Sequence, residues 1–530
     1  MRRCSSLRSF LLSGGLFSLL VVACGHEIPR GGEGRTSSSG NSTSTDTNAG
    51  GSGNTGNTST GGTPMSNTDA NACPTDVQLK KDIGRPGYTA PRDPGVATLL
   101  KDMSTEDKIK QLYGIPTPPW NNGYGDVYND IERSEDANSG AGSKKVRGYR
   151  YRDAGRGANL AAGQDNRKSQ GKDYSTAFPT PSIRAASWDM ELEARVGEAM
   201  GDETTGSKNN MLLAPCMNII RHPFWGRTQE TYSEDMYHTG RMASAFTAGL
   251  QKRVVGCAKH FAANNIENGR DNQNAEMDEQ TLREVYAQHF DMVIREGGVG
   301  CIMASYNSIN GTKSTQNKHL LTEILRTPVD KGGMGYRGMV ISDWWAMPGS
   351  QDGPGHDASA ISTAQEKALE AFKAGLDIEV PWALFYGQLP NLVGKGITEE
   401  EINTAAGRVL EQKFRFGSVW GDGTSSDPWG LVTPTTKLEG DSITNNDANL
   451  ALAEESAIKS AVLLKNGTGD DKVLPIKSDN VKKIAVIGME VTVTVHQETT
   501  LPVTGDKLNF ATTINVGDRG SSRVNPDPDK

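Results

Sequence analysis

The sequence predicts an α/β protein whose main part is a parallel (β/α) barrel of the TIM type, followed by a partial α/β sandwich domain. Strand-like apolar runs recur at intervals of roughly forty residues, in 210–220, 253–261, 299–307, 337–344 and 374–381. Helical patterns lie between them; in 278–297 the apolar side chains fall on one helix face. This alternation is typical of a parallel barrel. A doubly wound sheet would show the same alternation but usually has fewer units.

Polar side chains follow the carboxyl end of each apolar run. These ends meet on one face of a barrel, where barrel enzymes hold their active sites. We therefore expect the strand-end side chains to lie close together. They are Asn218, Arg221, Lys259, His260, Ser305, Tyr306, Asn307, Asp343, Trp344, Asp377 and Glu379.

The stretch 337–347, RGMVISDWWAM, combines a short buried strand with a carboxylate and two indoles. Asp343 at a strand end, beside Trp344 and Trp345, suits a sugar site, because flat rings cover the apolar faces of a pyranose. The alternative is that Asp343 caps the next helix and the tryptophans belong to the core. A motif this short leaves both interpretations open.

Composition limits the class of protein. A chain of 530 residues allows two or three domains. Hydrophobic residues make up only 35% of it and 61 residues are glycine, so part of the chain is expected to be non-globular. The net charge of -8 argues against a nucleic-acid-binding surface. No apolar segment has the length of a mature transmembrane helix.

Residues 1–24 read as an export signal. Arg2 and Arg3 precede a short apolar run in 10–23, which ends in Val-Val-Ala before Cys24 and Gly25. This pattern is similar to a bacterial lipobox and predicts a lipoprotein in which Cys24 is lipidated. The expected location is the bacterial outer membrane or cell surface, since Gly25 is not the aspartate that signals inner-membrane retention. The alternative is an ordinary secretory signal with an incidental Cys24, which would give a periplasmic or secreted protein.

Residues 25–75 are rich in glycine, serine, threonine and asparagine and predict a flexible linker. Cys216, Cys257 and Cys301 lie in apolar runs and are expected to be buried free thiols. The sequence has no CxxC spacing, and we predict no metal and no cofactor.

Three helices and two domains are expected around these runs. A helix is predicted in 96–112, with a capping box at Ser104 and Asp107, and 120–142 reads as a loop. A helix in 399–416 ends at Gly417, and another spans 448–465 before a buried strand in 483–488. No GxGxxG or P-loop follows. The predicted domains are a barrel in 76–420, a connector in 421–446 and a second domain in 447–530.

Seven motifs together resemble glycoside hydrolase family 3, from about residue 96 to the end of the sequence. The resemblance implies a barrel followed by an α/β sandwich, and an exo-acting retaining hydrolase of the β-glucosidase type. The expected substrates are β-linked glucosides and oligosaccharides. The motifs are WGRTQETYSED (225–235), KHFAANNIENGR (259–270), SYNSING (305–311), SDWW (342–345), AGLDIEVP (374–381), VLLKN (462–466) and GDRGSSRV (517–524).

The resemblance implies roles for individual residues. Asp343 matches the nucleophile, and Asp153 in YRDAGRG matches the carboxylate that holds sugar hydroxyls. Trp344 matches an aromatic wall of the acceptor site. The other matches are to glycone-binding residues or to a ring beside the nucleophile, and they are Arg227, Lys259, His260 and Tyr306. Without the motifs, structural ion pairs for the two cations and a hydrogen-bonded core histidine would be the expected interpretation.

Three departures from the family pattern bear on function. Ala154 and Gly155 stand where the family has Gly-Pro, and Thr228 stands where asparagine is frequent. The family places its acid/base glutamate further along the sandwich domain than this sequence reaches. The N-acetylglucosaminidase branch is not indicated, because the loop after KHF has no histidine. The alternatives to a β-glucosidase are a β-xylosidase-type specificity and a non-catalytic glycan-binding remnant.

Overall fold

The structure is a computed structural model, and it describes 94–114, 137–138, 145–146, 149, 151–159, 174–206, 209–348, 361–381, 383–420, 444–469, 472–476, 494–500, 507–513, 522 and 524. All of these residues belong to one compact unit, Asn71–Lys530. The predicted export signal, the linker in 25–75 and the strand in 483–488 lie outside the described residues. The predicted boundaries between barrel, connector and second domain stay predictions.

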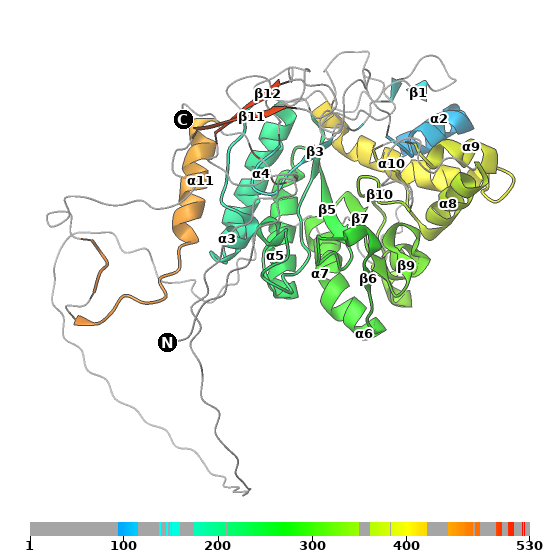
Figure 1. Ribbon diagram of the computed structural model, residues 1–530. Helices are drawn as coiled ribbons and strands as arrows, with labels where there is room; N and C mark the ends of the chain where they lie inside the picture. The colour runs from blue at the N-terminus through cyan, green and yellow to red at the C-terminus, as the bar shows by residue number, and fades with distance from the viewer. Residues whose placement is uncertain are drawn as a thin grey trace, which may run out of the picture. The chain divides into compact units, whose positions relative to one another are not determined.

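Five parallel strands form the central sheet in the order β10-β7-β5-β4-β3 (Figure 1). Each pairs with its neighbour in parallel register, and four of them fall inside the predicted apolar runs. The fifth predicted run, 374–381, continues this order through single bridges from Ile378 to Ile341 and from Glu379 to Tyr113. The strands are β3 (Tyr151–Asp153), β4 (Met211–Leu213), β5 (Val255–Phe261), β7 (Cys301–Ala304) and β10 (Met339–Ser342).

The sheet is curved as a barrel requires. The ring of Tyr151 on β3 meets the indole of Trp344, just after β10, edge to face at 5.7 Å between ring centroids. β3 and β10 are the outermost of these five strands, so a residue of β3 meets one just after β10 only if the sheet closes. Every residue of β4, β5, β7 and β10 is buried, as expected for a parallel sheet covered by helices.

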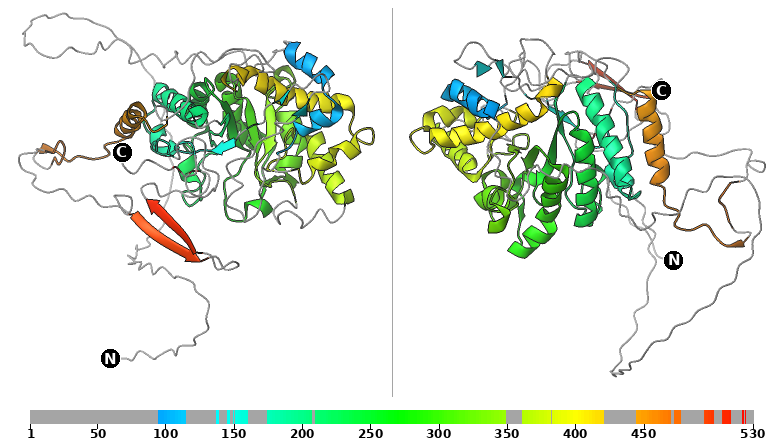
Figure 2. Two further views of the ribbon diagram at one scale, coloured as in Figure 1. Left: turned by 90° about the horizontal axis from the view of Figure 1, so that it is seen from above. Right: turned by 180° about the vertical axis from the view of Figure 1, so that it is seen from behind.

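Helices α4 (Met190–Gly206) and α5 (Met236–Leu250) pack side by side along the sheet (Figures 1 and 2). Glycines allow this close approach. A Cβ atom on Gly249 would lie 1.9 Å from the Ala194 carbonyl oxygen, and one on Gly197 would lie 2.2 Å from that of Phe246. The two helix backbones are therefore nearer to each other than side chains would permit.

The helix predicted in 278–297 is confirmed, but it contains π turns that the periodicity did not reveal. It consists of α6 (Glu279–Thr281), the π-helical η3 (Leu282–Ala287), α7 (Gln288–Met292) and the π-helical η4 (Val293–Gly297). The Asp278 carboxylate accepts a hydrogen bond from the Thr281 backbone N–H at 2.7 Å and caps its start.

Three predicted helix bounds are wrong. The single helix in 96–112 is two helices, α1 (Pro94–Asp102) and α2 (Thr105–Lys110), because Ser104 caps α2 by accepting from the Asp107 backbone N–H. Helix α10 (Glu399–Trp420) continues past Gly417, since one glycine does not end a helix. Helix α11 (Asp447–Lys459) ends six residues before 465, and Val462, Leu463 and Leu464 after it are exposed.

The remaining elements are the helix α8 and shorter helices and strands. They are β1 (Ala137–Asn138), β2 (Lys145–Val146), α3 (Pro181–Ala185), η1 (Thr228–Glu230), η2 (Arg270–Asn272), β6 (Asn274–Ala275), β8 (Ser308–Ile309), β9 (Thr312–Lys313), η5 (Ser314–Gln316), η6 (His319–Ile324), η7 (Val329–Lys331), α8 (Ile361–Ala374), η8 (Tyr386–Gln388), α9 (Leu389–Leu392), β11 (Thr494–Thr500) and β12 (Lys507–Thr513). Within the described ranges, no helix is long and apolar enough to cross a membrane.

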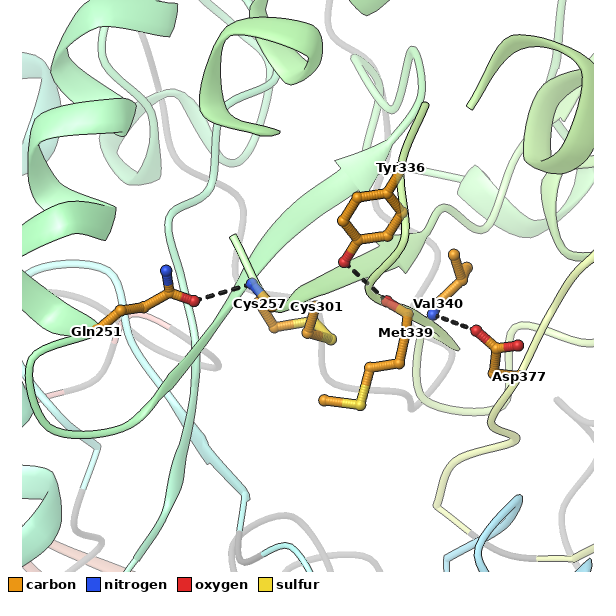
Figure 3. The surroundings of a disulfide bond; sticks show 8 residues. Gln251, Cys257, Cys301, Tyr336, Met339, Val340 and Asp377 are labelled. Carbon is orange, nitrogen blue, oxygen red and sulfur yellow. Dashed lines mark hydrogen bonds between the residues drawn. A yellow bond between two sulfur atoms is a disulfide. The ribbon is translucent and has the colours of Figure 1, made fainter. Parts of the chain in front are cut away.

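Cys257 and Cys301 form a disulfide bond between β5 and β7 (Figure 3). The prediction of free thiols is wrong for this pair. The two residues are register partners on neighbouring strands, and their Cα atoms lie 4.2 Å apart. Register is a tertiary property that apolar runs do not reveal. Cys216 is a buried free thiol, as predicted.

Asp377 joins three parts of the barrel wall and does not belong to the strand-end group with which we expected it. Its carboxylate accepts from Arg326 at 2.5 Å, from Arg408 on α10 at 2.9 Å and from the Val340 backbone N–H at 2.8 Å (Figure 3 shows the last). Asp377 is 1% exposed, so these contacts compensate the burial of its charge. Glu379 likewise accepts from the backbone N–H groups of Phe385 and Tyr386.

We expect Asp377→Ala to lower the free energy of unfolding by about 3–5 kcal/mol, because the substitution leaves the buried Arg326 without its partner. Chemical denaturation measures this change. Lys252→Ala is the control, since its pair with Glu198 is 53% and 33% exposed; a loss of at most about 1 kcal/mol is expected there. Equal effects of both variants would contradict the role of Asp377.

Candidate active site

Asp343 follows β10 directly and has one held and one open carboxylate oxygen. Its Oδ1 accepts from the Trp344 backbone N–H at 2.7 Å, and its own N–H donates to the Ala304 carbonyl at 3.1 Å. Oδ2 is buried, lies 3.4 Å from His260 Nε2 and has no hydrogen-bond partner among the described residues. A buried oxygen of this kind is available to a ligand.

The two tryptophans beside Asp343 belong to the core as well as to the site. Trp344 is 6% exposed and Trp345 is 9% exposed, and both pack into the main apolar cluster. The alternative that we held for them from sequence is therefore correct in this respect. Asp343 does not cap a helix, since its Oδ1 accepts from the next residue's backbone N–H.

Lys259 and His260 are consecutive at the end of β5, yet both reach a carboxylate of the site. Lys259 Nζ lies 3.2 Å from Asp153 Oδ1, and His260 Nε2 lies 3.4 Å from Asp343 Oδ2. Neighbouring residues of a regular strand face opposite sides. The pairing of β5 with β7 shifts register between Ala258 and Phe261, and this irregularity re-aims the side chains.

Asn218 fixes the orientation of His260. Its Oδ1 lies 3.0 Å from His260 Nδ1 and accepts from the His260 backbone N–H, while its Nδ2 donates to the His260 carbonyl. Burial lowers the pKa of His260 well below its usual value, and the charges of Arg227, Lys259 and Arg270 lower it further. A neutral ring that donates from Nδ1 accepts at Nε2. Nε2 and Asp343 Oδ2 are thus two neighbouring acceptors, suited to a hydroxyl donor.

Asp153 ends β3 and faces Lys259. Its side chain keeps 18% exposure, whereas that of Lys259 has 2%. Burial raises the pKa of Asp153, and the Lys259 ammonium opposes this rise. Asp153 and Lys259 therefore present an acceptor and a donor side by side, which is the combination that binds vicinal hydroxyls.

Arg227 is engaged in the ion pair that we considered as its alternative role. Its Nε and Nη2 donate to Glu230 Oε1 and Oε2 at 3.0 and 2.7 Å, and both residues are buried. Burial lowers the pKa of Arg227, but the charge of Glu230 raises it and the net shift is well upward. Arg227 still acts on the site through its field, which lowers the pKa of His260 and of Asp153.

Arg270 packs on the ring of Tyr306 and is a further residue of the site. From the sequence we named it only as part of the motif 259–270. The guanidinium of Arg270, on η2, lies 3.7 Å from the Tyr306 ring centroid. Burial and then the charge of Asp343 hold the pKa of Tyr306 well above its usual value, so the phenol stays protonated. Burial lowers the pKa of Arg270, whereas Tyr306 and Asp343 raise it. The sequence signal that could have indicated Arg270 as a site residue is its place at the end of the motif 259–270, eleven residues after Lys259.

The structure thus brings six of the seven predicted residues together at the ends of β3, β5, β7 and β10, with Arg227 beside them. The cations Lys259, Arg227 and Arg270 lie with the carboxylates of Asp153 and Asp343 in this group, a set of charges that can bind hydroxyls. Cys24 lies outside the described residues. Among the residues that are described, no three His, Cys, Asp or Glu side chains are grouped to hold a metal ion.

Comparison with known proteins identifies the same region. Residues 131–412 match the family model described as glycosyl hydrolase family 3 N terminal domain. Thermostable β-glucosidase B of Acetivibrio thermocellus is 34% identical over 317 residues, covering 59% of this chain and 36% of that protein. An exo-α-(1→6)-L-arabinopyranosidase of Bifidobacterium breve is 33% identical over 364 residues, covering 66% and 42%.

Solved structures agree on the fold. β-Glucosidase 3B of Thermotoga neapolitana, in complex with glycerol, gives a TM-score of 0.55 at 28% identity, covering 70% of this chain and 47% of that one. A family 3 β-glucosidase of Bifidobacterium adolescentis gives 0.54 at 30% identity, covering 71% and 46%. The chain spans less than half the length of each of these relatives.

We expect His260 to stay neutral at mildly acidic pH, where an ordinary imidazole is already protonated, because burial and then the charges of Arg227, Lys259 and Arg270 hold its pKa well below the usual value. Nitrogen-15 NMR of the imidazoles measures this. The internal reference is His319, whose contacts with Glu323 and Glu279 raise its pKa, so it should be protonated at pH 6.5. Titration of His260 together with His319 would show that the buried cations do not act on it.

Proposed function

Because the chain belongs to glycosyl hydrolase family 3, we propose that it is a retaining, exo-acting β-glycosidase that releases terminal non-reducing β-D-glucose through a covalent glycosyl–Asp343 intermediate. The family places the chemistry at O-glycosyl bonds. The chain covers only part of its relatives, so activity, substrate and mechanism are all part of this proposal.

One observation carries the proposal. Asp343 Oδ2 is buried and without a hydrogen-bond partner in the described part of the chain, while Oδ1 is held by the Trp344 backbone. A carboxylate held in this way has a fixed direction of attack. A carboxylate with a purely structural task, such as Asp377, has both oxygens occupied.

In the proposed reaction, Asp343 Oδ2 attacks the anomeric carbon and the glycosidic carbon–oxygen bond breaks. The leaving oxygen takes a proton from a general acid, and the same group then removes a proton from the water that releases the sugar with net retention. We assign this second role to no residue of the described chain. The resemblance places it in the sandwich domain.

The glycone is proposed to lie between Asp153, Lys259 and His260. The Asp153 carboxylate and Lys259 ammonium, 3.2 Å apart, supply an acceptor and a donor. Nε2 of His260 adds an acceptor, and the Arg270–Tyr306 pair closes the side next to Asp343. Trp344 is proposed as the wall toward the acceptor, although most of its surface is already covered.

The sugar is tested by comparing glycosides of a hexose and of two pentoses. Relatives are named β-glucosidase and exo-α-(1→6)-L-arabinopyranosidase, so a hexose and a pentose are both represented at similar identity. A panel of 4-nitrophenyl glycosides of β-D-glucose, β-D-xylose and α-L-arabinopyranose separates these specificities. Highest kcat/KM on the xyloside would favour the β-xylosidase-type alternative.

We expect Asp343→Asn to lower kcat by at least about a thousandfold, because the amide cannot attack, while glucose binding weakens far less. Turnover of 2,4-dinitrophenyl glucoside measures the loss, since this leaving group needs little protonation. A 2-deoxy-2-fluoro glucoside should label Asp343, as detected by peptide mass spectrometry.

The same experiment tests the competing interpretations. Labelling of another carboxylate would overturn the assignment of Asp343. Binding of glucose without labelling or turnover would favour the glycan-binding remnant. Lys252→Ala is the control variant, because its pair with Glu198 is exposed.

We also propose that the protein is exported and anchored to the membrane only through a lipid on Cys24, on the strength of the signal in residues 1–24. The expected location is the outer membrane or cell surface of a bacterium. This rests on the sequence alone.

Expression in a Gram-negative host should therefore give a mature protein that partitions into detergent and carries acyl chains on Cys24. Cys24→Ala should abolish the acylation and the partitioning. An unmodified mature N-terminus at another residue, found by mass spectrometry, would rule out the lipoprotein.

A further inference from the structure

Residues from the distal part of the chain pack against the loop that carries Asp153. Ser522 and Val524 are 1% and 3% exposed, although they lie about 370 residues after that loop in the sequence. A Cβ atom on Gly155 would lie 3.2 Å from both Cβ and Oγ of Ser522. A Cβ atom on Gly157 would lie 2.9 Å from Val524 Cγ2. The contact is therefore close and leaves no space for a side chain.

The segment 175–178 also holds the loop. The Phe178 backbone N–H donates to the Arg156 carbonyl at 2.8 Å, and Ser175 Oγ donates to the Ala158 carbonyl at 2.5 Å. The Thr176 carbonyl oxygen would lie 2.4 Å from a Cβ atom on Gly157. Residues 155–158 thus contact both the segment 175–178 and the pair Ser522 and Val524.

The segment 175–178 is in turn fixed by the chain that leads into α11. The Glu203 carboxylate, fully buried, accepts from the backbone N–H and hydroxyl of Thr176. It also accepts from the Asn445 backbone N–H at 2.8 Å and from Asn449 Nδ2 at 3.0 Å. Residues after 440 therefore contact the loop directly, through Ser522 and Val524. They also support it indirectly, because Asn445 and Asn449 bind Glu203, which holds Thr176.

Displacement of this loop would be transmitted to Asp153. The Asp153 carbonyl accepts from the Asn159 N–H at 2.9 Å, and Ala154 bridges Ala158, so the loop is closed at its base. The Asp153 carboxylate lies only 3.2 Å from Lys259 Nζ. A shift of a few tenths of an ångström at Gly155 changes where this carboxylate meets a hydroxyl. Misplacement by about 1 Å can reduce a rate roughly a hundredfold.

We propose that Ser522 and Val524 are positioning residues, which hold the loop 153–158 so that Asp153 is placed for the glycone. The inference rests on the proposed function, because it assigns the distal region a part in substrate binding at that site. In this proposal Ser522 and Val524 act on the glycone site of the barrel through Asp153. This role is separate from any group that the same part of the chain supplies to the reaction.

A double-mutant cycle between Gly155 and Ser522 tests the contact. In Gly155→Ala the new methyl group meets Ser522, and the φ angle of Gly155 lies outside the left-handed region, so the backbone itself accepts alanine. We expect KM for 4-nitrophenyl β-glucoside to rise about tenfold with kcat changed less. Ser522→Gly removes both atoms that the methyl group meets, so the double variant should return to within about twofold of the wild type.

The variant Asp153→Ala distinguishes a positioning role of Ser522 from a merely structural contact, because only a positioning role makes the effect of Gly155→Ala on KM depend on Asp153. If Ser522 acts through Asp153, the effect of Gly155→Ala on KM should disappear once Asp153 is alanine. Persistence of the full effect in that background would overturn the positioning role. Gly387→Ala is the matched control, since its Cβ would make only an ordinary contact of 3.6 Å with Ala383, and it should leave KM unchanged.

Hydrogen exchange of peptides that cover 151–159 separates this inference from the proposed function. Gly155→Ala should speed exchange there and Ser522→Gly should slow it again in the double variant, whether or not the protein turns over a glycoside. If the wild-type protein turns over none of the 4-nitrophenyl glycosides, the proposed function is wrong, and so is the role of the loop in substrate binding. Normal turnover with unchanged exchange and unchanged KM in Gly155→Ala would sink the inference alone.

Val524→Ala is a second variant for the case in which Gly155→Ala does not fold. It removes the methyl groups that pack on Gly157 and adds no atoms. The same rise in KM and in exchange is expected. No change in either would also overturn the proposal.

Discussion

The parallel register of β5, β7 and β10 is the constraint on which the rest of the site depends. Ala304 is the register partner of both Phe261 and Ser342, so the three strands end at one level although the register of β5 shifts before its end. Residues at and just beyond these ends are then neighbours in space. Lys259 and His260, Tyr306, and Asp343 come from segments more than 30 residues apart, and register alone makes them one group.

Charge inside this group is balanced because buried ions must be paired. Asp343 and Asp153 face Lys259, Arg270 and Arg227, and Arg227 is itself matched by Glu230. Burial, and then the charges of Arg227, Lys259 and Arg270, lower the pKa of His260 and keep its imidazole neutral, which makes Nε2 an acceptor instead of a donor. The same side chains would lose this function if exposed, because water would screen their fields.

The loop after β3 shows how specificity can depend on residues far from the sugar. Its sequence, with Ala154 and Gly155 after Asp153, departs from the pattern of family 3. Small residues at 154, 155 and 157 are what allow Ser522, Val524 and Thr176 to approach. A change in any of these contacts would move the carboxylate that we propose to bind the glycone, without altering any of the other proposed site residues.

The sequence by itself determined the barrel, the positions of its later strands and most of the residues that the structure brings together in the candidate site. Apolar runs ending in polar residues are local patterns, and local patterns survive folding. It did not reveal β3, which is only three residues long, the break between α1 and α2 at Ser104, or the disulfide between Cys257 and Cys301. Tertiary structure alone decided which oxygen of Asp343 is open, that Arg227 is paired with Glu230, that Arg270 joins the site and that Asp377 does not. Each of these depends on contacts between residues distant in sequence or on side-chain orientation, and neither leaves a periodic trace in the chain.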